Sequence, residues 1–233
     1  SQGVEFLEVP VVKSRSEGGV HIYGNPHIQN SPLNGKIIAK NIATGLSSVD
    51  PNNGAYYEER YKQFCHEIDE RLFGAELVRL MGSQVLNRQV KNSDEFIEFL
   101  KTHDYQGEPL FNQLGGWLKQ GLPMRGKKVI GYHKNWAYFN SLFGLKMVNY
   151  VEPKPSIPPT PKHLESVIEQ MQAENIDVVV AANYFPEDRV RALANKVGAK
   201  VVIVPLDVNG VPEVLTYFDY IDYLVENISA VCE

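Results

Sequence analysis

The stretch that decides the fold is KKVIGYHKNWAYFNSLFGLKMVNYVEP, which spans Lys127–Pro153. It reads as strand, turn, helix and strand. Val129 and Ile130 form a short apolar run that is typical of a buried strand. An apolar stripe with helical spacing then extends to Gly144, and glycine commonly ends helices. A second apolar run follows and stops at Glu152-Pro153, so this stretch predicts one strand–helix–strand unit.

His133 stands directly after the first of these strands. In open α/β sheets, ligands bind just beyond the carboxyl ends of the strands. This position makes His133 the first candidate for a binding residue. The alternative is a structural histidine that is held by hydrogen bonds.

The same alternation continues to the end of the chain. Strands are expected over Lys127–Tyr132, Leu145–Val151, Asp177–Ala182 and Lys200–Val204. Helices are expected over Trp136–Phe143, Pro161–Glu174, Glu187–Val197 and Pro212–Val231. Apolar strands that are separated by helices predict a parallel sheet with helices on both faces.

The front of the chain follows a different pattern. Val4–Val12 is apolar and rich in β-formers, which favours one strand. Ser31 before Pro32 predicts the start of a helix, with Ser31 as its N-cap. The apolar face of that helix would be formed by Ile37, Ile38, Ile42 and Leu46.

Asp50-Pro51 starts a second helix in the same way. Its apolar residues are spaced by four, three, four and four, which predicts one unbroken helix to about Leu72. They are Tyr57, Tyr61, Phe64, Ile68 and Leu72. At ~1.5 Å per residue, such a helix could extend over about 30 Å and bridge two lobes.

These patterns predict an α/β protein in three parts. Residues 1–50 would be the remnant of an amino-terminal lobe, and residues 51–125 the long bridging helix with a helical connector. Residues 126–233 would form the carboxyl-terminal α/β lobe. The alternative is that the front half forms a small helical domain that wraps the α/β half. Shorter helices are expected within the connector, over Gly74–Gly82 and Ser93–Thr102.

Composition excludes several classes of function. A net charge of −5 over 233 residues, without a basic run, argues against a nucleic-acid surface. No apolar segment approaches the ~18 residues that span a bilayer, and the first residues lack the features of a signal peptide. Cys65 and Cys232 fit either one disulfide or two thiols, and the composition suits periplasm and cytoplasm equally.

Four residues are candidate metal ligands. His21 and His27 lie in the loop HIYGNPH, while His133 and Asp207 follow strands. Imidazole nitrogens and a carboxylate suit Zn²⁺, which takes three or four such ligands. The chain lacks GxGxxG after a strand, GxxxxGK[ST], GxSxG and HExxH, so nucleotide binding and the common hydrolase chemistries are disfavoured.

The segment GNPHIQNSPLNGKIIAKNIATGLSSVDPNNGAYYEERYKQF resembles part of the zinc- and manganese-binding receptors of ABC importers. Those receptors carry PHxWxDP, a helix, and then a long DP-initiated helix. The segments YHKNWAYFNSLFGLKMVNYVEPKPSIPPTPKHL, VVVAANYFPEDRVRALANKVGAKVVIVPLD and YFDYIDYLVENI resemble the carboxyl lobe of the same family. The resemblance covers the chain from about residue 20 and is weakest over residues 75–115.

This resemblance implies a two-lobed receptor fold, with His27 and His133 as metal ligands and Asp207 near the final aspartate of the family. Three departures weaken the match. Gln29 and Ser31 replace the Trp and Asp of PHxWxDP, and Ala182 stands where many members have glutamate. The first ligand of the family has no counterpart here, which implies that the amino lobe is only partly present.

The function implied is an extracytoplasmic, monomeric receptor that captures a divalent metal, Zn²⁺ before Mn²⁺, and delivers it to an ABC permease. Such a receptor is not an enzyme and binds no nucleic acid. Two alternatives remain. One is a degenerate or truncated receptor without metal, and the other is an α/β enzyme that uses His133 and Asp207 as acid and base.

Overall fold

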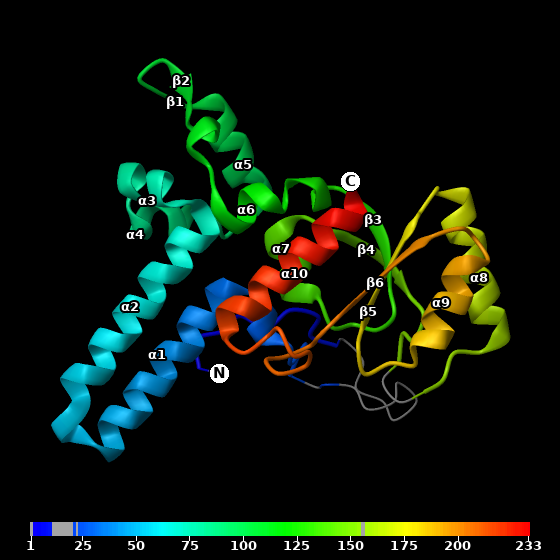
Figure 1. Cartoon of the computed structure of the whole chain (residues 1–233), viewed down its shortest axis with the longest axis horizontal. Coiled ribbons are helices and arrows are strands. Elements are labelled where there is room, and N and C mark those ends of the chain that lie inside the picture. Colours follow the sequence, from blue (N-terminus) through cyan, green and yellow to red (C-terminus); the bar gives the residue numbers. More distant parts are fainter. Residues whose placement is uncertain (1, 11–20, 22, 155–156) are drawn as a thin grey trace. The chain divides into compact units, whose positions relative to one another are not determined.

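The computed structural model describes residues 2–10, 21, 23–154 and 157–233 (Figure 1). The chain divides into two compact units. The first comprises Ser1–Glu5 and Ile28–Leu122, and the second comprises Phe6–His27 and Pro123–Glu233. The second unit therefore draws on two separated parts of the chain. The three-part division expected from the sequence stays a prediction.

The first unit is built mainly from helices. In chain order these are α1 (Pro32–Val49), α2 (Gly54–Phe73), α3 (Ala75–Met81), α4 (Ser83–Gln89), α5 (Ser93–Thr102) and α6 (Gly116–Gln120). The short strands β1 (Asp104–Tyr105) and β2 (Glu108–Pro109) pair antiparallel between α5 and α6. Short 3-10 turns cover Ile28–Asn30, Pro51–Asn53, Leu110–Gln113 and Leu122–Met124.

The predicted helix starts at Pro32 and near Pro51 are confirmed, and α2 runs without a break to Phe73. The strand expected over Val4–Val12 is wrong for residues 4–10, and residues 11 and 12 lie outside the described residues. Glu8 has φ +52° and Pro10 cannot donate to a strand ladder, so an extended strand is disfavoured there.

The apolar face predicted for α1 is also partly wrong. Ile42 and Leu46 are 57% and 41% exposed, whereas the small residues Gly35 and Ala43 are buried. Small side chains let two helices approach closely, so the buried stripe of α1 follows Gly35 and Ala43 instead of the larger aliphatic residues.

A buried polar cluster joins three helices of the first unit. The carboxylate of Asp69 on α2 is 2.5 Å from Nζ of Lys36 on α1, and it accepts a hydrogen bond from Nδ2 of Asn87 on α4 at 3.0 Å. Lys36 also donates to Oδ1 of Asn87 at 3.0 Å. Asp69 is buried, and loss of one partner would leave an uncompensated buried charge. The cluster therefore specifies how α1, α2 and α4 pack.

Glycines allow the end of α2 to touch the start of α6. The Gly115 N–H donates to the Phe73 carbonyl at 2.8 Å. Gly116 has φ +57°, and a Cβ at this position would lie 2.0 Å from the carbonyl oxygen of Arg71. A side chain is therefore excluded at Gly116 both by its backbone conformation and by the adjacent backbone.

The second unit is a parallel four-stranded sheet flanked by helices, as predicted. Its strands are β3 (Lys128–Gly131), β4 (Lys146–Tyr150), β5 (Val178–Ala182) and β6 (Lys200–Val204), in the order β4-β3-β5-β6. All three strand pairs are parallel. The helices are α7 (Ala137–Phe143), α8 (Pro161–Ala173), α9 (Glu187–Asn195) and α10 (Tyr217–Cys232).

Helices cover both faces of this sheet, with α8 and α9 on one side and α7 and α10 on the other (Figure 1). Every residue of β5 is buried, which explains its uninterrupted apolar sequence. The last helix begins at Tyr217 and not at the predicted Pro212. Thr216 and Asp219 form a capping box, each side chain bonding the other's backbone N–H, and this fixes the start of α10.

The sheet has a topological switch point. From β3 the chain passes through α7 to β4 on one side, whereas from β5 it passes through α9 to β6 on the other side. The loops after β3 and β5 therefore leave in opposite directions. Such a switch opens a crevice at the carboxyl ends of the two strands, which is where α/β sheets bind ligands.

The glycine contact between α2 and α6 makes a testable prediction. We expect Gly116→Ala to destabilise the protein by about 3 kcal/mol, because the new Cβ meets the Arg71 carbonyl and the residue keeps a positive φ. The matched control is Gly45→Ala in α1, where a Cβ meets nothing within 4 Å. This control should stabilise by about 0.5–1 kcal/mol. Urea unfolding measures both, and equal stabilities would contradict the contact.

Candidate metal site

His133 lies two residues after the end of β3, at the switch point, and is only 8% exposed. Its Nδ1 is 2.7 Å from the carbonyl oxygen of Glu152. A carbonyl oxygen can only accept, so Nδ1 carries a proton, and in the neutral imidazole the lone pair is on Nε2. A histidine whose other nitrogen donates to a carbonyl is typical of metal ligands.

His27 is oriented by Asn25. The Asn25 amide nitrogen donates to Oε2 of Glu8 and to the carbonyl oxygen of Lys134, both at 2.8 Å. Since both partners are acceptors, the amide orientation is fixed and its Oδ1 faces His27. Oδ1 accepts from the His27 backbone N–H at 3.0 Å and lies 2.8 Å from Nδ1 of the ring. His27 therefore also carries its proton on Nδ1 and its lone pair on Nε2.

The loop that carries His27 is tied to its surroundings by its backbone. The Asn25 N–H donates to the Leu7 carbonyl at 2.8 Å, and the Tyr138 hydroxyl donates to the Asn25 carbonyl at 2.8 Å. Tyr138 belongs to α7, the helix that follows His133. The two histidines are therefore positioned by neighbouring parts of one hydrogen-bonded network.

The environment of His27 disfavours a proton on Nε2 of its ring. Burial is the main cause, followed by the nearby imidazoles of His21 and His133, and together they lower the pKa of His27 from 6.5 to about 4. His27 consequently stays neutral at neutral pH. A neutral imidazole is the form that binds a metal.

Asn135 connects His27 to the loop after β5. Its Nδ2 donates to Nε2 of His27 at 3.2 Å and to the Tyr184 hydroxyl oxygen at 3.1 Å. Asn135 is fully buried, which is unusual for a polar side chain. Nothing in the sequence marks this residue, because an asparagine in a strand–helix loop is normally assigned to the turn.

Aromatic rings pack beside His133. The Phe185 ring lies 6.1 Å from the His133 ring and 4.3 Å from the Tyr132 ring, measured between centroids. Tyr184 packs on Phe185 at 4.2 Å. Of these, Tyr132 belongs to the stretch that decides the fold, whereas Tyr184 and Phe185 come from the loop after β5. The rings limit how far the His133 imidazole can turn.

The two other predicted ligands, His21 and Asp207, are exposed. The His21 ring meets the edge of the His27 ring at a centroid distance of 6.4 Å, but it is exposed. Asp207 is exposed beyond β6, and its Oδ1 accepts from the Val208 N–H at 2.9 Å. Among the described residues, no group of three or more His, Cys, Asp or Glu side chains is arranged to hold a metal.

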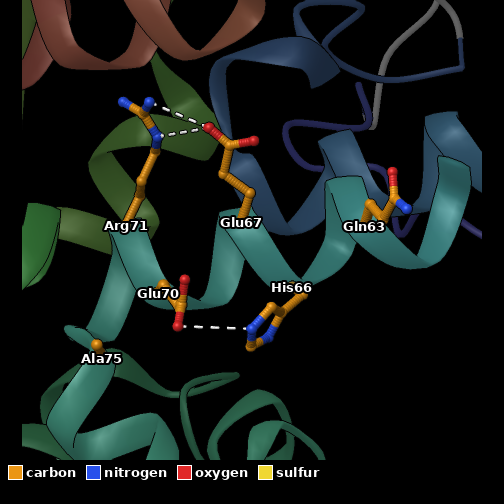
Figure 2. A pocket seen from close by; sticks show the side chains of 6 residues that line it. All are labelled: Gln63, His66, Glu67, Glu70, Arg71 and Ala75. Atoms are coloured by element: carbon orange, nitrogen blue, oxygen red, sulfur yellow. Dashed lines mark hydrogen bonds and ion pairs between the residues drawn. The ribbon is translucent and has the colours of Figure 1, made fainter.

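A separate hollow lies on α2 in the first unit (Figure 2). His66 is 3.5 Å from Glu70, and the Arg71 guanidinium is 3.0 Å from Glu67. These exposed pairs link successive turns of one helix, and such pairs contribute little to stability. The His66 side chain is exposed, which makes it a suitable control for the candidate ligands.

Comparison with known proteins decides the family. A family model described as "Zinc-uptake complex component A periplasmic" matches residues 1–71 and 105–231. The chain belongs to this family. Its members are solute-binding proteins of ABC metal importers and not enzymes, so the predicted family is confirmed and the enzyme alternative is excluded.

Two curated relatives illustrate the range of metals. The manganese ABC transporter substrate-binding lipoprotein PsaA of Streptococcus mitis is 36% identical over 66 residues, which are 28% of this chain and 20% of that protein. The high-affinity zinc uptake system protein ZnuA of Brucella abortus is 22% identical over 181 residues, which are 77% of this chain and 42% of that protein. The matched parts thus span between a fifth and two fifths of these relatives.

Solved structures share the fold. A zinc-bound ZnuA with residues 138–173 deleted has a TM-score of 0.62 and 21% identity, covering 100% of this chain and 67% of that one. The laminin-binding adhesin Lmb from Streptococcus agalactiae has a TM-score of 0.62 and 19% identity, covering 96% and 69%. A Mn-bound periplasmic metal binding protein from Candidatus Liberibacter asiaticus has a TM-score of 0.60 and 15% identity, covering 100% and 69%.

In the part of the chain that the structure describes, no helix is long and apolar enough to cross a membrane.

The environment of His27 makes stability depend on pH. Because the folded chain lowers the pKa of His27 from 6.5 to about 4, unfolding takes up a proton in this window. Stability should therefore fall as pH drops from 6.5 to 4, by about 1–2 kcal/mol after allowance for the partly exposed ring. Urea unfolding at pH 7 and pH 4.5 measures the loss.

His27→Gln should reduce this loss of stability, since glutamine does not titrate. His66→Gln, which changes an exposed histidine on α2, should leave the loss as in the wild type. A wild-type stability that is equal at both pH values would contradict the assignment.

Proposed function

We propose that the chain is the extracytoplasmic binding protein of an ABC importer, and that it captures a divalent transition metal at His27 and His133. The captured metal is passed to a membrane permease. The single observation that carries this proposal is the pair of imidazoles whose Nδ1 atoms are both engaged by fixed acceptors, 2.7 Å from Glu152 O and 2.8 Å from Asn25 Oδ1. Each ring thereby keeps Nε2 for the metal.

Zinc is the metal that this donor set suits best. Two neutral imidazoles favour Zn²⁺, whereas Mn²⁺ prefers carboxylate and carbonyl oxygens. His21, next to the His27 ring, and Asp207, beyond the end of β6, are the further candidate ligands. The zinc- and manganese-named relatives are consistent with either metal.

The second candidate function is a receptor that has lost its metal. The observation that favours it is the absence, among residues 2–10, 21, 23–154 and 157–233, of a group of three or more acidic, cysteine or histidine ligands. The departures at Gln29, Ser31 and Ala182 from the family pattern point the same way. A metal titration separates the two candidates.

Calorimetric titration of Zn²⁺ and Mn²⁺ into the metal-stripped protein is the test. We expect zinc to bind more tightly than manganese, and His27→Ala and His133→Ala each to weaken zinc binding by about a hundredfold. His66→Ala and His103→Ala are the controls, since His66 pairs with Glu70 and His103 stacks on Phe99. Binding that is unchanged in both site variants would refute the site, and a wild type without binding would favour the metal-free receptor.

A further inference from the structure

The Asn135 amide donates a hydrogen bond to Nε2 of His27, the atom that would bind the metal in the proposed function. Its two N–H groups are both used, one on Nε2 of His27 and one on the Tyr184 oxygen. These partners come from two different segments of the second unit, the loop before residue 28 and the loop after β5. A nitrogen lone pair that accepts a hydrogen bond cannot bind a metal at the same time. Metal binding at His27 must therefore displace this N–H.

The displaced amide stays next to the site. Asn135 is fully buried and follows β3 by only four residues, so its side chain has little room to swing away. A half-turn about the last side-chain bond of asparagine exchanges NH₂ for oxygen without changing the shape of the group, and this torsion is soft. The half-turn would put an oxygen lone pair where an N–H had been.

Tyr184 tolerates the exchange. Its hydroxyl now accepts from the Asn135 amide, and a phenol can equally donate to an oxygen at the same place. The contact between Asn135 and Tyr184 is therefore kept in both orientations. Only the contact with His27 changes: the hydrogen bond between the two side chains is replaced by a metal ion that both Nε2 of His27 and the amide oxygen of Asn135 contact.

The donor set at His27 and His133 leaves room for a third ligand. Within the described ranges, no third His, Cys, Asp or Glu side chain completes a group with this pair. Zinc takes at least three protein ligands at most sites, and a side-chain amide oxygen is a known oxygen ligand for divalent cations. Asn135 is the buried polar side chain that already touches His27 Nε2.

We infer that Asn135 is a third metal-contacting residue, whose amide donates to His27 in the metal-free protein and presents its oxygen to the metal in the bound one. This inference rests on the proposed function. The three donors that it names, two imidazoles and one amide, carry no charge themselves. Compared with a carboxylate at the same position, the neutral amide of Asn135 attracts hard cations such as Mn²⁺ less strongly.

The test uses Asn135→Ala, Asn135→Asp and the matched control Asn149→Ala, whose amide bonds Gln170 at 2.7 Å. Zn²⁺ and Mn²⁺ are titrated by calorimetry into each variant of the 233-residue chain, and Co²⁺ is titrated with its visible absorption recorded. We expect Asn135→Ala to weaken zinc binding at least about tenfold and to alter the cobalt spectrum. Asn149→Ala should change neither.

Asn135→Asp keeps the shape of the side chain and adds a charge, so it tests the inference even if Asn135→Ala folds poorly. Its manganese affinity should rise more than its zinc affinity. Asn135→Ala that binds zinc as tightly as the wild type, or more tightly, with an unchanged cobalt spectrum, would overturn the inference while leaving the proposed function intact. A wild type that binds neither metal would overturn both the inference and the proposed function. If the wild type binds zinc and His27→Ala weakens that binding, the proposed function stands even where Asn135→Ala has no effect.

Discussion

The candidate site depends on the side-chain amide of Asn25. It donates to Lys134 O and Glu8 and accepts from the backbone and ring of His27, so that four hydrogen bonds meet on one buried group. A buried amide that has all its partners is rigid, and removal of any one of them leaves an uncompensated polar atom. Because Lys134 follows His133 directly, the same amide fixes His27 relative to the strand end that carries His133. The tautomer of His27 follows from this network, whereas the Glu152 carbonyl sets that of His133.

The groups that orient His27 and His133 are neutral. Carbonyl and amide oxygens orient the two imidazoles, burial keeps His27 unprotonated, and aromatic rings border His133. In water, neutral ligands of this kind bind metal weakly, whereas burial removes the competing solvent and holds the ligands in place. In the site proposed above, orientation and burial would thus take the role that charge has in carboxylate-rich sites.

The sheet could be predicted from sequence because its signals are local. Val129, Ile130 and the run at Val178–Ala182 are continuous apolar stretches, and the spacing of helices between them leaves a parallel sheet as the simple arrangement. The roles of Asn25 and Asn135 could not be predicted, since their partners lie 109 and 108 residues away in sequence. Likewise, the large residue Ile42 of α1 is exposed because small residues form the helix contact, which periodicity alone does not reveal.

The second unit is discontinuous in sequence, and this has a consequence for folding. Residues 28–122 form an excursion between Phe6–His27 and the rest of that unit. The contacts of Asn25 and His27 with the segment after β3 are therefore of high contact order, and closing so long a loop costs entropy before these contacts can form. The sheet can assemble from Pro123–Glu233 first, with the His27 loop docking late. Cleavage of the chain anywhere within the excursion would leave one histidine of the pair on each fragment.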